Sequence, residues 1–558
     1  MAQRPTPISR AERGRRQRFA GSAIALYATA LGIALLVYLP SLRGPFLSDD
    51  SIYLTQNPQV QQVSLEHVLE ILDPGGDLAL RIANYAPLHL LGHMAEWALF
   101  GDTLLAYHVV NVALHAWVVV LLIGLLRDSG VPARGALLAG GLFLVHPANV
   151  EAVAWICQLK TVLAMALMLV ALRLRRRRPV AGALAFVLAL LAKATAAVGL
   201  PVALLLEWAR GGAGRGAGAD GPRWGDLVAW GAALAAFAVV QFRALGHVQI
   251  GNVPLSEDVV VRVWTTLAIA GRYLVMAATS YGVSAFHQPG PTASPFDPWV
   301  IAALALLAGL GALSLRALIG RREEAAWWAW AALSFLPVAQ ITPFVYPIAD
   351  RYLYFMLPGL LGGCLLAGRD ALARLAPPTA ARLARAAEVT ALCLAVAFAW
   401  HAVERAALWT SEQRLLVDAI RHYPDGPSSH YARAREAAAR GDATTAVGHL
   451  QRATVRGQHS LDQLFTDPAF GSLRAHPDFQ ALTGQLARQQ IEQMGRAAQL
   501  TEPNQIKLAQ AHLIAGEPER AAEILEALLA AGGDFEAEAW ALLAQARRAE
   551  RARQREAR

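Results

Sequence analysis

The chain has 558 residues, of which 55% are hydrophobic and only 16% are charged, and its formal net charge is +8. Soluble domains carry roughly 25% charged residues, so the apolar excess predicts a membrane protein and excludes a single globular domain. The positive charge is almost all arginine in short loops between apolar runs, which is typical of topology determinants and argues against nucleic-acid binding. The three cysteines, Cys157, Cys364 and Cys393, lie inside apolar runs, so no disulfide framework is expected.

The N-terminus predicts an uncleaved first span. Six arginines between Arg4 and Arg18 precede an apolar run over 19–40. The run has about the ~20 residues that cross a bilayer, and no small-residue cleavage site follows it. Residues 1–18 are therefore expected to be a basic cytoplasmic segment.

Ten more apolar runs predict an all-α, polytopic domain of about eleven spans over 19–405. They lie at 104–126, 134–147, 151–172, 179–193, 195–208, 224–243, 298–316, 326–344, 352–368 and 386–404. The cluster of Trp327, Trp328 and Trp330 predicts aromatic anchoring at the membrane interface.

Two further apolar segments do not fit as single spans. Residues 259–283 carry two arginines, which predicts a helix in the membrane plane or a pair of half-spans. Residues 87–100 are too short to span, and His89, His93 and Glu96 recur there at helical spacing. This pattern predicts an amphipathic helix lying on the surface and leading into the second span.

Charge predicts the orientation of the spans. With eleven spans, the arginine-rich segments near 13–18, 173–178, 210–223 (including Arg215), 316–322 and 369–385 share one side, expected to be the cytoplasm. The acidic first outer loop, 41–86, and the C-terminus then share the other side. The Ala-, Arg- and Gly-rich composition indicates a bacterium with GC-rich DNA. This places the protein in the cytoplasmic membrane and its outer face in the periplasm.

The segment 406–558 is rich in charge and predicts a separate soluble helical domain. Two helix-turn-helix units have tetratricopeptide-repeat spacing, and small residues let their helices approach closely. The matching positions are Ala434, Gly441, Ala446, Leu450 and Ala453, then Leu508, Ala509, Gly516, Ala521, Leu525 and Leu528. Stacked repeats form binding surfaces, so protein partners are expected here.

The sharpest chemical motif is the pair Asp49 and Asp50, shortly after the first span. One carboxylate can accept the proton of an attacking hydroxyl. The other can orient a sugar or hold a divalent cation such as Mg or Mn. A solvated turn is the alternative interpretation.

An ordered series of short motifs accompanies this pair. It reads FLSDD at 46–50, NP at 57–58, YAPL at 85–88, FG at 100–101, YHVVNV at 107–112, LH at 114–115, HP at 146–147, VEAVAWI at 150–156, LAK at 191–193 and ADRYLY at 349–354. With the repeats that follow, the series resembles the GT-C glycosyltransferase superfamily, in particular its protein O-mannosyltransferase-like branch with transmembrane and tetratricopeptide-repeat regions.

The resemblance implies transfer of a hexose, by default mannose, from a polyprenyl-phosphate lipid to a hydroxyl of a protein or envelope glycan. It implies Asp49 and Asp50 as the catalytic centre. The chain departs from the family at Ala86, Gln158 and Ala194, where charged residues are usual, so an inactive relative stays open. A membrane-anchored repeat scaffold and a glycan polymerase or ligase also stay open.

Other ionisable residues within the apolar runs are secondary candidates. Lys160 and Lys193 are two of only three lysines and could hold a lipid phosphate, or could reach for head groups. Arg351 could contact the same phosphate or pair with Asp350.

Polar residues on two other predicted helices are interpreted separately. His146 and Glu151 flank a predicted helix break, where Glu151 could be a second acid. His108, Asn111 and His115 share a helix face and predict hydrogen bonds between helices more than a metal site.

Overall fold

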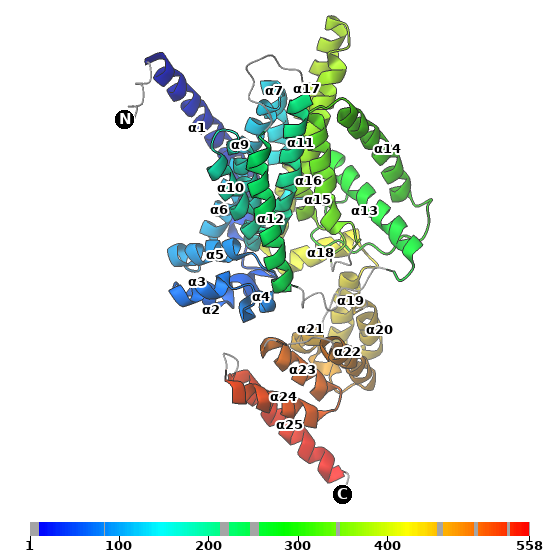
Figure 1. Ribbon diagram of the computed structural model, residues 1–558. Coiled ribbons are helices and arrows are strands. Elements are labelled where there is room, and N and C mark those ends of the chain that lie inside the picture. Colours follow the sequence, from blue (N-terminus) through cyan, green and yellow to red (C-terminus); the bar gives the residue numbers. More distant parts are fainter. Residues whose placement is uncertain are drawn as a thin grey trace, which may run out of the picture.

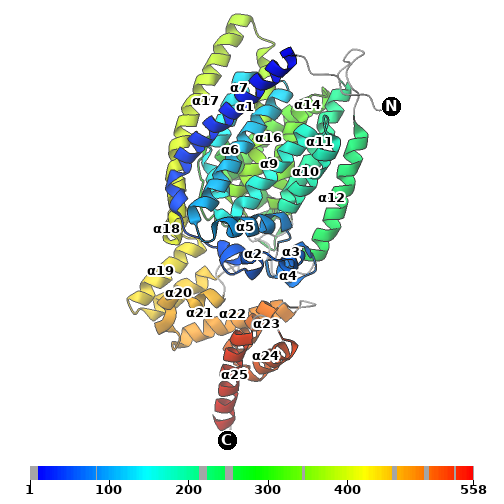
Figure 2. The same ribbon diagram turned by 90° about the vertical axis from the view of Figure 1, so that its left-hand side faces the viewer.

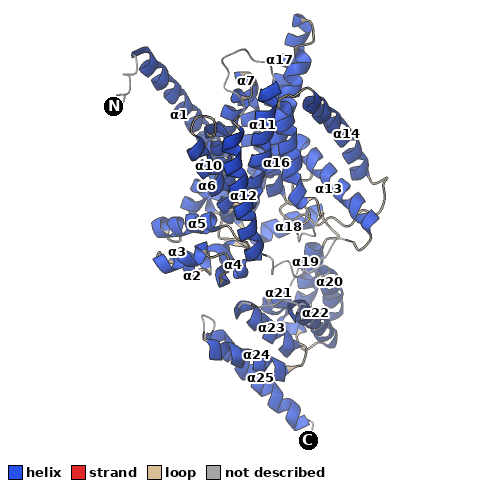
Figure 3. Ribbon diagram, viewed as in Figure 1, coloured by secondary structure: helices blue, strands red, loops and turns tan. Residues whose placement is uncertain are grey.

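The computed structural model describes residues 10–82, 84–212, 223–245, 256–341, 346–454, 461–495, 500, 502–532 and 536–556. Within them the chain is helical and has no strand (Figure 3). Arg215, which contributed to the predicted topology, lies outside these residues.

The N-terminal part is a bundle of helices, and small helices cover one of its ends (Figure 1). Its helices are α1 (Arg10–Tyr38), α2 (Pro58–Gln61), α3 (Leu65–Leu72), α4 (Asp77–Ile82), α5 (Pro87–Phe100), α6 (Leu104–Asp128), α7 (Ala133–Leu144), α8 (Val150–Ala154), α9 (Leu159–Leu174), α10 (Pro179–Ala192), α11 (Gly199–Gly212), α12 (Trp224–Leu245), α13 (Val259–Thr279), α14 (Pro298–Ile319), α15 (Glu324–Phe335), α16 (Asp350–Leu372) and α17 (Pro377–Ala406). Short helical turns join them, among them η1 (Leu39–Arg43), η2 (Ser51–Thr55), η3 (Pro147–Asn149), η4 (Ile156–Gln158), η5 (Ala194–Val198), η6 (Leu336–Val338) and η7 (Ala407–Thr410).

Eight helices of the described chain are long and apolar enough to cross a membrane, which supports a multi-pass membrane protein. The number rises to nine if α7 and the segment Pro147–Ala154, bent by 54°, count as one broken span. The expected number of about eleven spans is therefore higher than the number of described helices that are long enough to span on their own. Helices α10, α11 and α15 have 14, 14 and 12 residues. At ~1.5 Å per residue they reach about 20 Å, less than the ~30 Å hydrocarbon core.

Helix α13 corrects a second expectation. It is one continuous helix of 21 residues that meets the length and composition of a span, not a pair of half-spans. Arg272, which argued against a span, lies over the ring of Trp299 at 4.6 Å. Such a cation–π contact gives the guanidinium a partner inside the protein, so the charge does not break the helix. Figure 1 shows α13 and α14 together beside the main bundle.

Helix α5 was predicted to lie on the surface with its polar face outward, but that face is turned toward the protein. His89, His93 and Glu96 are buried, whereas Leu99 is 75% exposed. The helix precedes α6 as expected, but its polar side faces the protein because η2 and α9 supply polar groups there.

The tryptophans of α15 are buried, not interfacial as predicted. Trp327, Trp328 and Trp330 are each at most 4% exposed. Trp327 and Trp328 pack against glycines of α16: a Cβ at Gly363 would lie 2.6 Å from the Trp328 ring, and one at Gly362 would clash with Trp327. The interface therefore needs glycine on one helix and a large ring on the other.

Ion pairs gather at one end of the bundle, which we call the arginine end. Arg173 pairs with Asp128, Arg175 and Arg176 with Glu207, Arg210 with Glu323, Arg316 with Glu324, and Arg322 with Asp370. These pairs bring together the α6–α7, α9–α10, α11–α12, α14–α15 and α16–α17 connections. The Asp49–Asp50 loop lies at the opposite end, called the aspartate end, from which the C-terminal region extends (Figures 1 and 2).

The C-terminal region consists of paired helices. They are α18 (Glu412–His422), α19 (Pro427–Ala439), α20 (Ala443–Ala453), α21 (Leu461–Thr466), α22 (Pro477–Gly495), α23 (Glu502–Ile514), α24 (Pro518–Ala531) and α25 (Glu536–Glu556), with η9 (Pro468–Leu473) before α22. Gly441 and Gly516 end the first helix of each predicted repeat at φ of +77° and +79°, a conformation that favours glycine. The predicted small residues Ala434, Ala446 and Ala521 are fully buried between the paired helices.

The core of the membrane part extends beyond residue 405, where the composition changes. Trp409 and Leu415 are buried in that core, so η7 and α18 pack with the bundle. Separate cores begin with Ala434 in α19 and with Ile506 in α23. The repeat helices thus start after α18.

Candidate active site

The Asp50 carboxylate fastens the first outer loop to a second loop. It accepts the N–H of Leu47 and the N–H of Cys157, both at 2.8 Å, and is 1% exposed. Ser48 has φ of +50°, which closes the tight turn that lets the carboxylate reach back to Leu47. Burial raises the pKa of Asp50 to about 6, although the two N–H donors oppose this shift.

Asp49 is the freer carboxylate of the pair. It is partly exposed, and its printed side-chain contact within the described chain is the Ser48 hydroxyl at 3.4 Å. Its charge acts on Lys160, Tyr346 and Arg351, so these groups lie within its electrostatic range. Burial raises the pKa of Tyr346, and the nearby Asp49 raises it further. A general base must be accessible to the group whose proton it accepts, and Asp49 meets this condition whereas Asp50 does not.

The two lysines of the membrane part lie at this same end. The Lys160 ammonium donates to the Tyr53 hydroxyl at 3.1 Å and lies 4.3 Å from its ring centre. The Lys193 Nζ donates to the Thr161 hydroxyl at 2.8 Å. Neither lysine forms an ion pair within the described chain, and Lys160 is held inward by Tyr53 instead of extending to head groups. The two lysine amino groups therefore remain available for an anionic ligand.

Arg351 pairs with Glu151, not with its neighbour Asp350. Its guanidinium and its backbone N–H both bind the Glu151 carboxylate, the latter at 2.7 Å. Rings of Trp155, Tyr346 and Tyr352 surround the guanidinium, with Tyr352 nearest at 4.9 Å. Glu151 is thereby neutralised and is poorly placed as a second acid.

Asp350 turns away from this cluster. Its carboxylate binds His287 at 2.7 Å and the Ser284 N–H at 3.3 Å. The other nitrogen of His287 binds the Tyr423 hydroxyl at 2.9 Å, after α18. Asp350 therefore joins the bundle to the start of the C-terminal region.

His146 is a structural residue at the predicted helix break. Its Nδ1 accepts the Ala148 N–H at 3.2 Å, so its Nε2 carries the proton and donates to the Ala277 carbonyl at 3.2 Å. Both nitrogens are used, and the residue lies outside the group formed by Asp49, Lys160 and Lys193.

The helix face of His108, Asn111 and His115 makes the predicted hydrogen bonds between segments. His115 binds Tyr354 and the Leu144 carbonyl at 2.9 and 3.1 Å. His108 lies 3.1 Å from the Gly44 carbonyl, and Asn111 donates to the carbonyls of Trp155 and Ile156. His108 and Asn111 thus bind the same two loops that Asp50 joins. Their spacing along one helix could not reveal this role.

Tryptophans complete the junction of these loops. The Trp155 indole donates to the Leu47 carbonyl at 3.1 Å, and its ring stacks on Trp409 at 5.5 Å. Tyr53, Trp155 and Trp409 were not among the candidates from sequence because their contacts link distant segments. Two signals were available: Tyr53 follows the Asp pair by only three residues, and Trp155 lies inside the motif VEAVAWI.

The carboxylates at this end do not fit a divalent cation. Both oxygens of Asp50 already accept backbone N–H groups, and Asp49 is surrounded by cationic side chains. A hard cation needs several oxygen ligands and repels ammonium groups. Within the described residues, no three His, Cys, Asp or Glu side chains form a metal-binding group. We therefore derive no catalytic step through Mg or Mn.

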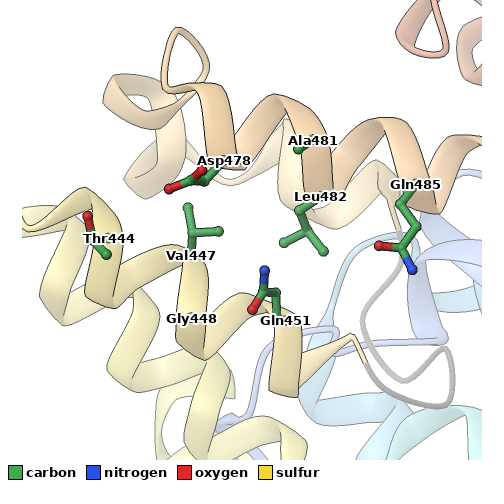
Figure 4. A pocket seen from close by; sticks show the side chains of 8 residues that line it. All are labelled: Thr444, Val447, Gly448, Gln451, Asp478, Ala481, Leu482 and Gln485. Atoms are coloured by element: carbon green, nitrogen blue, oxygen red, sulfur yellow. The ribbon is translucent and has the colours of Figure 1, made fainter.

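A second candidate surface lies in the repeat region. Helices α20 and α22 border a groove of about 320 Å³. Figure 4 shows Val447 and Leu482 between polar side chains at its margins. Its lining residues are Thr444, Val447, Gly448, Gln451, Asp478, Ala481, Leu482 and Gln485. A single carboxylate and two amides suit binding better than catalysis.

Comparison with known proteins gives partial matches. No family model matches the chain. The chain is 34% identical over 131 residues to protein O-mannosyl-transferase Tmtc1 of Drosophila melanogaster, covering 22% of this chain and 15% of that protein. It is 35% identical over 143 residues to TMTC1 of Mus musculus (25% and 15%) and 31% identical over 172 residues to TMTC1 of Homo sapiens (28% and 18%).

The chain thus spans less than one fifth of the length of the curated relatives it matches. The matches confirm the resemblance to the O-mannosyltransferase-like family that the motif series predicted. Among solved structures, ArnT from Cupriavidus metallidurans bound to undecaprenyl phosphate aligns with 85% of this chain and 80% of its own, at 16% identity and a TM-score of 0.33. At that similarity the alignment carries no argument about this chain.

Proposed function

We propose that this chain is a membrane glycosyltransferase that moves a hexose, mannose by family default, from a polyprenyl-phosphate donor to a hydroxyl of a protein or envelope glycan. The observation that carries the proposal is an accessible carboxylate, Asp49, whose charge acts on Lys160 and Arg351. At the same end, the amino groups of Lys160 and Lys193 have no carboxylate partner in the described chain. Sugar transfer from a phosphate needs both a base and cations for the leaving group.

The reaction is an in-line displacement at the anomeric carbon. The acceptor oxygen forms a bond to that carbon, and the carbon–oxygen bond to phosphate breaks, with its electron pair passing to the phosphate. Asp49 takes the proton of the acceptor hydroxyl. Configuration inverts because a single displacement occurs, and the proton leaves Asp49 for water or for the released phosphate.

The surrounding residues have separate roles in this scheme. Lys160 and Lys193 bind the phosphate and stabilise the charge it gains. Asp50 holds the loop that carries Asp49 against Cys157. Arg351, neutralised by Glu151, orders the aromatic rings around the site and contributes less charge than its sequence position suggested.

We propose that the protein lies in a bacterial cytoplasmic membrane, with its aspartate end in the periplasm. The arginine end then faces the cytoplasm, as the excess of positive charge at that end favours. The repeat region shares the periplasmic face and selects or holds the acceptor. A repeat scaffold without catalysis is the second candidate, favoured by the separate groove between α20 and α22.

The test is sugar transfer in membranes that contain the protein, supplied with labelled polyprenyl-phosphate hexoses and with envelope extract as acceptor. Transfer from one donor, absent in Asp49→Asn membranes with equal protein, supports the enzyme. No transfer from any donor by the wild type supports the scaffold. Because no step uses a metal ion, transfer is expected to persist in EDTA.

A further inference from the structure

A second polar cluster lies on α5, beside the group that the proposed mechanism uses. The His93 Nδ1 lies 2.6 Å from the Glu96 carboxylate, and the His89 ring is 4.5 Å from the His93 ring. His89 also packs edge-on against Tyr53, at 4.9 Å, and Tyr53 receives the Lys160 hydrogen bond. All three α5 side chains are more than nine-tenths buried.

Three nitrogen atoms of this cluster have no hydrogen-bond partner in the described chain. They are the Nε2 of His93 and both ring nitrogens of His89, which has the Cys157 backbone nearby but does not meet the geometry of a hydrogen bond with it. A buried polar atom without a partner costs about 1–3 kcal/mol, so a phenylalanine would be the cheaper residue if these rings served only for packing. That both positions carry histidine instead points to a polar ligand.

The protonation pattern selects the kind of ligand. Because the His93 Nδ1 binds Glu96, the Nε2 of that ring is left for a ligand. Burial lowers the pKa of His89 well below its usual value, and His93 and Lys160 add to this effect, so His89 is neutral and offers one N–H donor. A hydroxyl group both donates and accepts and therefore complements this pair, whereas a phosphate diester oxygen only accepts.

Two other ligands fit less well. The phosphate already has Lys160 and Lys193 beside this cluster. A metal ion would need at least a third ligand, and none joins the two histidines to form such a group in the described residues. The two ring centres are 4.5 Å apart, so one ligand group can contact both rings.

We propose that His89 and His93 bind one hydroxyl of the donor hexose and so determine which sugar is transferred. The inference rests on the proposed function and names residues that read the sugar. Tyr53 covers the His89 ring, so it turns aside when the sugar enters. Glu96 is a positioning residue that holds the His93 ring through Nδ1 and leaves its Nε2 toward the ligand.

The experiment uses the full-length protein in membranes and a set of polyprenyl-phosphate hexoses, each lacking one hydroxyl. The wild type should discriminate against one deoxy donor by about 10²-fold or more in kcat/KM, because its loss leaves buried polar atoms unpaired. His93→Phe and His89→Phe keep a ring of similar volume and should lose that discrimination while treating the other deoxy donors as the wild type does. A structural role alone would affect every donor equally.

His67 on α3 supplies the matched control. It lies in the first outer loop, before α5, and its Nδ1 binds the Gln62 carbonyl at 2.7 Å. His67→Phe should keep the full discrimination. Each variant is assayed at an equal amount of protein in the membrane, and its thermal unfolding verifies that it is folded.

The possible outcomes separate the two proposals. A wild type that transfers no sugar from any complete donor overturns the proposed function and this inference with it. A wild type that transfers sugar but accepts every deoxy donor equally overturns this inference alone. So do histidine variants that keep the wild-type discrimination.

Discussion

The Asp50 carboxylate and the backbone N–H of Cys157 meet at 2.8 Å although the two residues are 107 positions apart in the chain. This bond joins the first outer loop to the turn between α8 and α9. It separates the roles of two adjacent aspartates, since Asp50 is occupied by the fold and Asp49 is left for a reactant.

The first prediction concerns Asp49. Asp49→Asn removes the proposed base but keeps the size of the side chain, so kcat should fall about 10²–10⁴-fold with little change in thermal stability. Transfer assays with the natural membrane extract measure the rate. Asp102→Asn, which changes an exposed carboxylate at the start of α6, should retain wild-type activity. An Asp49→Asn variant with the wild-type rate would contradict the assignment of the base.

The second prediction concerns the pH dependence of stability at Asp50. Its pKa rises from an ordinary value of 3.8 to about 6 in the fold, so the folded state binds more protons between these values. Stability from this group is therefore fully present below about pH 4 and is lost as pH rises through 6, by about 3 kcal/mol at most.

Asp50→Asn has no such titration. The difference in melting temperature between wild type and variant, followed from pH 4 to 7 in detergent, should shift against the wild type as pH rises. At every pH the amide accepts only one of the two N–H groups, which adds a constant loss of stability to the variant. A difference that does not vary with pH would show that Asp50 titrates normally.

The third prediction concerns Lys160 and Lys193. Charge-assisted hydrogen bonds contribute about 1.5–3 kcal/mol, so Lys160→Gln and Lys193→Gln should each weaken binding of polyprenyl phosphate roughly 10- to 100-fold. Binding of the labelled lipid to purified protein measures the effect. Lys507→Gln, in α23 of the repeat region, is the matched control and should bind as the wild type does. Lysine variants with unchanged lipid affinity would leave the phosphate without its proposed partners.

The fourth prediction concerns orientation. The aspartate end and the repeat region lie together, opposite the arginine end, so a reporter active only in the periplasm should be active when fused after Arg558. A second fusion within the turn at 320–323, between α14 and α15 at the arginine end, should be active only with a cytoplasmic reporter. The reverse pattern at both positions would place the proposed active site in the cytoplasm.

Sequence reasoning located the Asp pair and the repeats because each is local. Hydropathy defined the apolar segments, and glycine spacing defined the helix hairpins. Sequence reasoning failed where a distant segment decides whether a side chain is buried. The α15 tryptophans are buried because α16 places glycines opposite them, and the polar side of α5 is buried because Tyr53 and Lys160 lie beneath it.

The same limit applies to the candidate site. One of the two interpretations of Arg351 was a pair with Asp350, its neighbour in sequence, but Glu151, 200 positions away, binds the guanidinium. Successive residues at the start of a helix point in different directions, so adjacency in sequence did not predict a pair. The long-range contacts of Trp155 and Asn111 were equally hidden.

The last prediction concerns where the C-terminal region can be removed. Composition suggests a cut near residue 410, but α18 packs with the bundle: Asp418 pairs with buried Arg405 and accepts the Ala285 N–H at 2.9 Å. Removing Asp418 leaves a buried guanidinium unpaired, which typically costs about 3–5 kcal/mol.

A protein ending at Asp425 keeps these contacts and loses only the repeat helices. It should insert and melt as the full-length protein does, keep binding of polyprenyl phosphate, and lose transfer to the natural acceptor. A protein ending at Thr410 should be markedly less stable, and Asp418→Ala in the full chain should reproduce that loss. Full transfer to the natural acceptor by the protein ending at Asp425 would show that the repeats do not select it, while equal stability of both truncations would place α18 outside the membrane core.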